Sequence, residues 1–362
     1  MTINRVLNMI RGFKQIAGLT LISRILGMLR DMTFAHFFGA DWLMTAWTMG
    51  FKIPNLARRL FGEGAASASV IPIYSEELEK DPDAAKRLAC SVVTVLAVFL
   101  TGVMLLAEIL IVVYALIFPP NEGTRLGLTL AAMMMPFMVC ICVVAVLGGI
   151  LNVHRHFLAP AAAPVLLNVV IIASAFLASA GLNLLPEQQV YVVAAGVVVA
   201  GVLQIGMQLR ALRQHGVILR PLWETHLPAF RRILLLMGPM VLGLTVTQLN
   251  TLADDLIALA FSNDQGQPLT WGSVSYLYYA QRLYQFPLGV LGISLATAIF
   301  PELSREAAKG AYNKMMQVVS RGLRISIFVA VPATVGLILV GRPIIAVLFE
   351  HGRFTAADTG ST

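Results

Sequence analysis

Residues 88–118 read LACSVVTVLAVFLTGVMLLAEILIVVYALIF, a run in which Glu108 is the single charged residue. A helix of about 20 apolar residues spans the hydrocarbon core of a bilayer, so this run predicts a membrane-spanning helix. Similar runs recur along the 362-residue chain, which is 58% apolar and 12% charged. Because soluble domains carry about 25% charged residues, this composition excludes a soluble enzyme. We therefore predict an all-α polytopic membrane protein.

Short polar connections divide the chain into apolar segments. We expect about ten transmembrane helices, at residues 13–38, 43–74, 88–118, 126–151, 158–181, 189–209, 233–262, 273–300 and 317–341 and in a segment that begins near 343. Alternate connections carry 17 lysines and arginines on one side but only Arg125 and Arg342 on the other. Positive residues are enriched on the cytoplasmic side of membranes, so this asymmetry predicts a cytoplasmic N-terminus. The same rule explains the net charge of +7, and we expect contact with membrane lipids but no nucleic-acid binding.

A short pattern occurs twice, six predicted spans apart. Residues 57–61 (ARRLF), followed by Pro72, are similar to residues 280–284 (AQRLY), followed by Pro301. Two parallel six-span repeats would form two lobes that face each other across a central cavity. We therefore predict an N-terminal lobe at 1–215 (spans 1–6) and a partial C-terminal lobe at 216–362 (spans 7–10).

Several charged residues lie inside apolar segments rather than in the connections. The first two segments hold Arg24, Arg30, Asp31, Lys52, Arg58, Arg59 and Glu63, and the eighth holds Arg282. A charge at the bilayer centre costs about 2.5–3.5 kcal/mol, so these side chains are expected to face water, one another or an anion. Because guanidinium groups match phosphate and carboxylate oxygens, the excess of arginine predicts a cationic cavity that binds such an anion.

Some of these residues have a second interpretation. Arg58 and Arg59 lie near the end of their segment, where long side chains can reach back to water. Asp31 and Glu63 fit a role as ion-pair partners as well as one in substrate contact. Asp254, beside Asp255 in the seventh segment, is either a hydrated acid near the outer end or an oxygen ligand for sodium. Adjacent helical residues point about 100° apart, so both acids cannot face one site equally.

Three stretches of sequence indicate a particular family more specifically than the composition does. They are SRILGMLRD at 23–31, FKIPNLARRLFGEGA at 51–65 and SVSYLYYAQRLYQFPLGVLGISLATAIFPELS at 273–304. They resemble the MurJ (MviN) family, the lipid II flippases of the multidrug/oligosaccharidyl-lipid/polysaccharide exporter superfamily. The resemblance implies a transporter rather than an enzyme, in the bacterial plasma (inner) membrane. Its implied substrate is lipid II, an undecaprenyl-diphosphate-linked disaccharide pentapeptide, carried from the inner to the outer leaflet by alternating access for cell-wall synthesis.

The resemblance also implies roles for individual residues. Arg24, Arg30, Arg58 and Arg282 would bind the substrate, and the spacing of the second segment adds Lys52. Glu63 would act in gating. From their charge and position in the segments, we add Asp31 and Arg59 as gating or ion-pair residues. Asp254 falls where some relatives have a sodium ligand, so sodium is the one ion that the resemblance implies. We expect a monomer.

The chain departs from the family pattern at three points. Thr45 stands where the family usually has an acid, and Gln281 where Asp or Asn is common. The family has about fourteen spans, so we expect a C-terminally truncated member. Two alternative functions remain open: export of another polyprenyl-diphosphate-linked oligosaccharide, or a multidrug/cation antiporter of the same superfamily.

Overall fold

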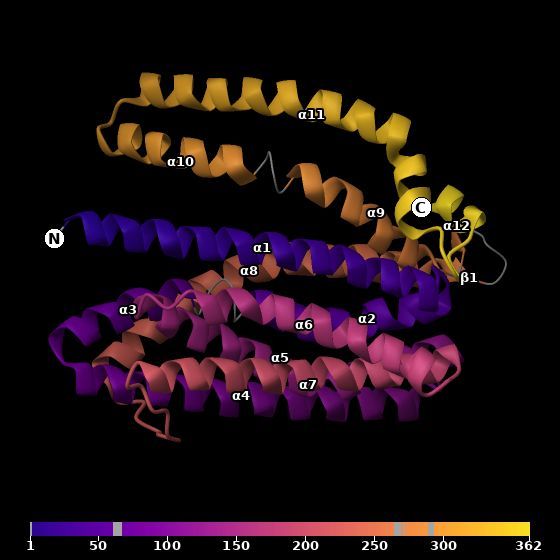
Figure 1. Ribbon diagram of the computed structural model, residues 1–362, viewed down its shortest axis with the longest axis horizontal. Coiled ribbons are helices and arrows are strands. Elements are labelled where there is room, and N and C mark those ends of the chain that lie inside the picture. The colour runs from indigo at the N-terminus through magenta and orange to yellow at the C-terminus, as the bar shows by residue number, and fades with distance from the viewer. Residues whose placement is uncertain (1, 61–66, 264–268, 271, 289–292) are drawn as a thin grey trace.

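The computed structural model describes residues 2–60, 67–263, 269–270, 272–288 and 293–362. Most of this part of the chain is helical, and the long helices run along one axis (Figure 1). The helices are α1 Thr2–Phe38, α2 Trp42–Ala57, α3 Ser67–Lys80, α4 Pro82–Ile117, α5 Glu122–Val153, α6 Leu158–Phe176, α7 Pro186–Gln214, α8 Pro228–Ala260, α9 Ser273–Pro287, α10 Ile293–Ala308, α11 Tyr312–Phe349 and α12 Ala356–Ser361. A π-helical turn, η2 (Leu177–Gly181), continues α6, and two short strands, β1 (Ser262–Asn263) and β2 (Leu269–Thr270), pair in parallel. The predicted all-α class is confirmed.

Six helices of the described chain are long and apolar enough to cross a bilayer, namely α4, α5, α6 with η2, α7, α8 and α11. Large apolar side chains such as Ile109, Leu242 and Phe328 are exposed on α4, α8 and α11. Exposed apolar surface of this extent is unfavourable in water and favourable against lipid tails. These helices therefore indicate an integral membrane protein, whereas the total of ten spans stays a prediction.

Two predicted segments are divided and one predicted boundary is wrong. Residues 43–74 contain α2 and part of α3, and residues 273–300 contain α9 and part of α10. No new segment begins near residue 343, because α11 continues without a break to Phe349. Pro332 and Pro343 both lie inside α11. Membrane helices tolerate interior prolines, so the Gly341-Arg342-Pro343 sequence does not end this helix.

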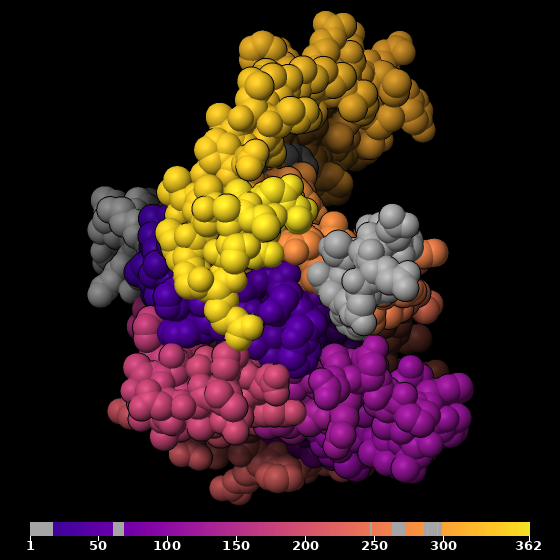
Figure 2. All heavy atoms as spheres, turned by 90° about the vertical axis from the view of Figure 1, so that its right-hand side faces the viewer, coloured from indigo at the N-terminus to yellow at the C-terminus, as the bar shows by residue number. Residues whose placement is uncertain are grey.

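The helices of the first 214 residues form a bundle around α5. Helix α5 packs against α2, α4 and α7, while α6 packs against α1 and α7. Helix α8 lies against α3, and α9 joins α2 to α11. In Figures 1 and 2, α10 and α11 lie on the opposite side of α1 from α4 and α7. The division into lobes at residue 215 stays a prediction.

Residues from the C-terminal part of the chain pack closely against the corner where α1 ends and α2 begins. We call this the α1–α2 end. Figure 2 views this end and shows the C-terminal residues lying against the α1–α2 corner. The Arg353 backbone N–H donates to the His36 carbonyl at 3.0 Å, and the Tyr279 hydroxyl donates to the Gly39 carbonyl at 3.1 Å. Gly272 has φ +101°, and a Cβ there would lie 2.5 Å from the Ala40 carbonyl oxygen. Only glycine allows so close an approach.

Three histidines gather at the opposite end of the bundle, which we call the α5–α6 end. The ring centres of His154 and His156 lie 5.9 and 5.1 Å from that of His215, the residue that follows α7. The Tyr74 hydroxyl lies 2.9 Å from Nε2 of His154. Partial burial lowers the pKa of His154 and of His156, and the neighbouring charge of His215 lowers them further. All three histidines lie outside the apolar spans.

The histidine cluster predicts acid sensitivity. A folded-state pKa below the ordinary value of about 6.5 means that the unfolded chain takes up protons first as the pH falls. The neutral histidines therefore leave the folded state at full stability above a pH of about 6.5, and their protonation favours the unfolded chain below it. We expect the melting temperature in detergent to fall between pH 7 and pH 5, and to fall less for His215→Gln. An equal pH dependence in both proteins would contradict this account.

Candidate functional site

A cavity of about 630 Å³ lies between α1, α2, α5, α6, α7, α8 and α9. Its lining on α5 extends from Phe137 to Asn152. Fifteen residues of helix rise by about 22 Å, so the cavity is elongated along the bundle. Its described lining holds one acid, Asp255, and five basic residues, Arg30, Lys52, Arg58, Arg59 and Arg282. The cavity therefore carries an excess of positive charge.

The carboxylate of Asp31 holds two of these arginines together. Asp31 is 2% exposed, and its Oδ1 accepts hydrogen bonds from Nε and Nη2 of Arg30 at 3.0 and 2.8 Å. Its Oδ2 lies 2.9 Å from Nε of Arg282, in an ion pair between α1 and α9. The Tyr278 hydroxyl also donates to Oδ1, at 2.6 Å. One buried acid thus fixes two guanidinium groups from helices about 250 residues apart in sequence.

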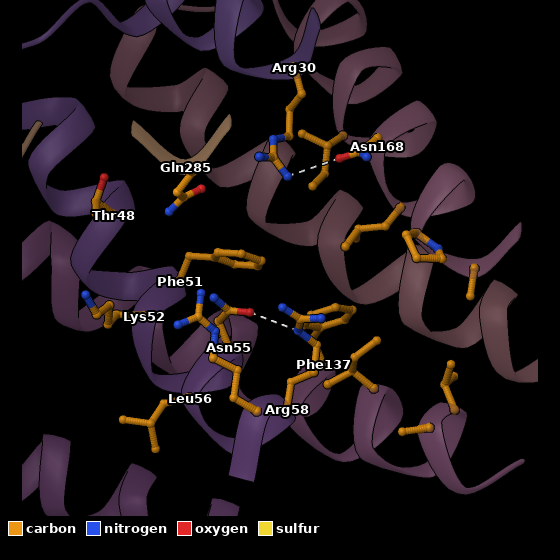
Figure 3. A pocket seen from close by; sticks show the side chains of 18 of the residues that line it. Arg30, Thr48, Phe51, Lys52, Asn55, Leu56, Arg58, Phe137, Asn168 and Gln285 are labelled. Atoms are coloured by element: carbon orange, nitrogen blue, oxygen red, sulfur yellow. Dashed lines mark hydrogen bonds between the residues drawn. The ribbon is translucent and has the colours of Figure 1, made fainter. Parts of the chain in front are cut away.

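Neighbouring groups fix the orientation of both guanidinium groups. Nη1 of Arg30 donates to Oδ1 of Asn168 on α6 at 3.0 Å, as Figure 3 shows, and Asn168 Nδ2 donates to the Ser23 carbonyl at 3.2 Å. Cζ of Arg282 lies 4.4 Å from the ring centre of Tyr278, four residues earlier on α9. Such a cation–π contact, with a bond from Nη1 to Gln285 at 3.1 Å, holds the Arg282 side chain at the cavity wall.

Lys52 forms a second ionic contact between helices, in this case between α2 and α8. Its ammonium group pairs with the carboxylate of Asp255, which is 3% exposed, and donates to the Thr251 carbonyl at 3.3 Å. Asp254 is exposed on another face of α8. The two adjacent acids thus diverge, as their helical spacing predicts. The sequence singled out Asp254, and the partner that α2 provides for Asp255 could not be read from local spacing.

The arginines that follow α2 also line the cavity. Nε of Arg58 donates to Oδ1 of Asn55 at 2.9 Å (Figure 3), and Nη1 of Arg59 donates to Gln248 of α8 at 3.3 Å. Both arginines are partly buried. Arg59 therefore contacts α8, as Lys52 does, so α8 is joined to α2 and to the residues that follow α2.

Other predicted residues lie elsewhere. Arg24 is exposed and lines a neighbouring cavity of about 270 Å³ rather than the main one, although Asn152, Pro160 and Pro164 line both. Glu63 lies outside the described residues. In the described chain, no group of three His, Cys, Asp or Glu side chains could hold a metal ion.

The residues that depart from the family pattern lie at defined places. Thr45 is buried at the α1–α2 end, where its hydroxyl lies 2.8 Å from that of Ser275. The Ser275 hydroxyl donates to the Asp41 carbonyl at 2.9 Å. Gln281 lines the cavity beside Arg282. Thr45 thus takes part in the contact between α2 and α9 that closes this end.

Comparison with known proteins identifies the family. A family model described as lipid II flippase MurJ matches residues 34–362, nearly the whole chain. The chain belongs to the MurJ lipid II flippase family. It is 32% identical to the lipid II flippase MurJ of Burkholderia cenocepacia in an alignment of 360 residues, which covers 97% of this chain and 67% of that protein. The predicted resemblance is confirmed, and the chain spans about two thirds of the length of this MurJ relative.

Solved structures agree with this assignment. A lipid II flippase MurJ in an inward closed conformation is 25% identical, with a TM-score of 0.76, and the match covers 96% of this chain and 69% of that one. An outward-facing multidrug resistance MATE family transporter is 15% identical, with a TM-score of 0.62 and coverage of 96% and 76%. The second match shows a shared fold alone, so the MurJ likeness is the more informative one.

The Asp31 network predicts a large loss of stability in Asp31→Asn. Removing the acid leaves two partly buried guanidinium groups without their shared countercharge, which costs about 3 kcal/mol in comparable buried pairs. The matched control is Asp83→Asn, because the Asp83–Lys86 pair has side chains that are 85% and 44% exposed. Exposed pairs contribute about 0–1 kcal/mol. We expect the melting temperature to fall in the first variant only, and equal values would contradict the network.

Proposed function

We propose that this chain transports lipid II from the inner to the outer leaflet of the bacterial plasma membrane by alternating access. The single observation that carries the proposal is the elongated cavity in a MurJ-family fold, with five basic side chains and one acid in its described lining. A diphosphate cannot cross hydrocarbon without replacement of its hydration. Guanidinium and ammonium groups supply charge-assisted hydrogen bonds that replace it.

Arg30 and Arg282 are the proposed centre of diphosphate binding. Both guanidinium groups are held in place by Asp31, so little side-chain freedom is lost when an anion binds. Asp31 accepts hydrogen bonds from one edge of Arg30 and forms an ion pair with Nε of Arg282, so it lies at donors that a diphosphate oxygen would use. A diphosphate carries more negative charge than one carboxylate, so it competes for these donors. Binding would then loosen the connection between α1 and α9, which allows the two parts of the chain to move.

The other basic residues are proposed to extend this site. Lys52 lies on α2, and Arg58 and Arg59 follow directly after this helix. Arg24, in the neighbouring cavity, would attract the anion before it reaches Arg30, because long-range charge steers anions toward a basic cleft. Gating by Glu63 stays a proposal from the family resemblance.

The direction of transport follows from the two ends of the bundle. We propose that the α1–α2 end faces the outside and that the N-terminus lies in the cytoplasm, supported by the excess of Lys and Arg in the connections of the opposite side. The close contacts at the α1–α2 end would then close the cavity to the outside. With a negative cytoplasm, outward movement of one negative charge gains about 2.3 kcal/mol per 100 mV.

The likeness to the MATE transporter raises the alternative of a cation exporter. The positive lining of the cavity argues against this substrate class, because like charges repel in a site of low dielectric. Export of another polyprenyl-diphosphate-linked oligosaccharide fits the same charges. Sodium binding at Asp254 and a monomeric state stay as separate proposals that rest on the family resemblance.

Lipid II binding tests the proposed function. We expect native mass spectrometry to detect lipid II on the chain in detergent, and Arg30→Gln and Arg282→Gln each to weaken binding about tenfold or more, since charge-assisted bonds contribute about 1.5–3 kcal/mol. Arg324→Gln, on the exposed surface of α11, is the control and should bind normally. Equal binding by all four proteins would overturn the assignment of the anion site.

Transport itself requires a second measurement. In a bacterium depleted of its own flippase, expression of the chain should restore the appearance of lipid II in the outer leaflet, and Arg30→Gln should not. Restoration by the folded, membrane-inserted Arg30→Gln protein would contradict the proposed role of this arginine.

A further inference from the structure

Two buried glutamines of α7 line the cavity and take no part in the charged networks described above. Gln204 and Gln208 are 0% and 1% exposed, and both line the main cavity. They are four residues apart, so they lie on the same face of α7. A fully buried primary amide beside a membrane cavity is unfavourable unless its polar atoms are paired.

The orientation of Gln204 is set by α6. Its Nε2 donates to the Ala163 carbonyl at 2.6 Å. A carbonyl oxygen only accepts hydrogen bonds, so the amide nitrogen must face α6 and Oε1 must point away from that carbonyl. Among the described residues, Oε1 of Gln204 and Oε1 of Gln208 have no hydrogen-bond partner. Both residues line the cavity, so its wall holds two buried acceptors that have no donor within the described chain.

These acceptors lie beyond the arginines along α6. Asn168, which holds Arg30, is five residues from Ala163, which holds Gln204. Five residues of helix correspond to about 7.5 Å. Gln208 lies further toward the α5–α6 end, since its Nε2 would be 3.7 Å from a Cβ built on Gly148, beside Pro160. Gly148 and Gly149 of α5 line the same cavity, and Gly148 lies against Pro160 and Gln208.

The chemistry of this wall differs from that of the arginine site. Acceptor oxygens repel the oxygens of a diphosphate, so the two Oε1 atoms are unsuited to the anionic group. They match hydroxyl and amide N–H groups, which donate hydrogen bonds. A sugar that carries hydroxyl and acetamido groups, joined directly to a diphosphate, would place such donors within several ångströms of the anion.

We propose that Gln204 and Gln208 form a subsite for the sugar next to the diphosphate of the transported lipid. This inference rests on the proposed function, because it uses the anion at Arg30 and Arg282 to fix the position of the sugar. The two sites would divide recognition between them. The arginines would bind any prenyl diphosphate, and the glutamines would favour one that carries a sugar.

Two soluble probes separate the subsite from the anion site. The first is farnesyl diphosphate, which has no sugar, and the second is farnesyl diphosphate linked to the disaccharide pentapeptide. We expect Gln204→Met and Gln208→Met each to weaken binding of the sugar-bearing probe by about threefold to tenfold, the effect of one lost neutral hydrogen bond. Binding of farnesyl diphosphate should change by less than twofold.

Gln189→Met is the matched control. Gln189 is also on α7 and 6% exposed, its Nε2 donates to the Leu184 carbonyl at 2.8 Å, and its Oε1 has no partner among the described residues. It does not line the cavity. We expect normal binding of both probes. If Gln204→Met unfolds through loss of its bond to α6, Gln208→Met tests the subsite by itself.

The outcomes distinguish this inference from the proposed function. Equal affinity of the glutamine variants and the unaltered chain for the sugar-bearing probe would overturn the subsite and leave the anion site standing. Equal loss of both probes would also overturn it, because the glutamines would then support the cavity as a whole. Failure of the unaltered chain to bind either probe would overturn the proposed function itself.

Discussion

The carboxylate of Asp31 is the charge on which the arrangement of the cavity depends. Arginines cannot lose their protons at any physiological pH, so each one placed inside a membrane needs a countercharge, water or an anion. Asp31 supplies one countercharge to both Arg30 and Arg282. It therefore stabilises the site and joins α1 to α9 across the cavity. A network with one acid and two arginines keeps a net positive charge, so it remains attractive to an anion.

The ion pair of Lys52 with Asp255 is a second case in which a buried acid pairs with a basic residue from another helix. It connects α2 to α8 through buried groups and neutralises the lysine. The two networks together provide ionic contacts between α1 and α9 and between α2 and α8. Apolar packing would hold the two parts in one arrangement, whereas ionic contacts can be exchanged for contacts with an anion. This property suits a transporter that must change conformation when its substrate binds.

The sequence predicted much of the fold and part of the site. Long apolar runs such as residues 88–118 predicted membrane helices, because length and composition alone decide this. The charge cost in lipid identified Arg30, Lys52, Arg58 and Arg282, all of which line the cavity. It could not separate them from Arg24, because the location of a side chain within a groove depends on the tertiary packing of α1 against α6. The Gly341-Arg342-Pro343 boundary was wrong because packing and lipid sustain a helix through a proline.

The sequence also missed the uncharged part of the cavity. Nothing in the local sequence distinguishes Gln204 and Gln208 from glutamines on a surface. Their spacing at i and i+4 is also common on any helix. Their significance depends on complete burial and on the partner that α6 gives to Gln204, both of which are properties of the assembled bundle. The partner of Asp31 on α9 was equally invisible, since no local rule connects residues so far apart.

The most direct test of the account is the effect of a diphosphate on Asp31→Asn. If Asp31 occupies the guanidinium groups that bind the substrate, removal of its charge should increase affinity for farnesyl diphosphate while lowering the stability of the empty chain. Each tenfold gain in affinity adds about 1.4 kcal/mol of ligand-dependent stability at saturating ligand. The account predicts that farnesyl diphosphate raises the melting temperature of Asp31→Asn more than that of the unaltered chain. A smaller rise in the variant, or none, would contradict it.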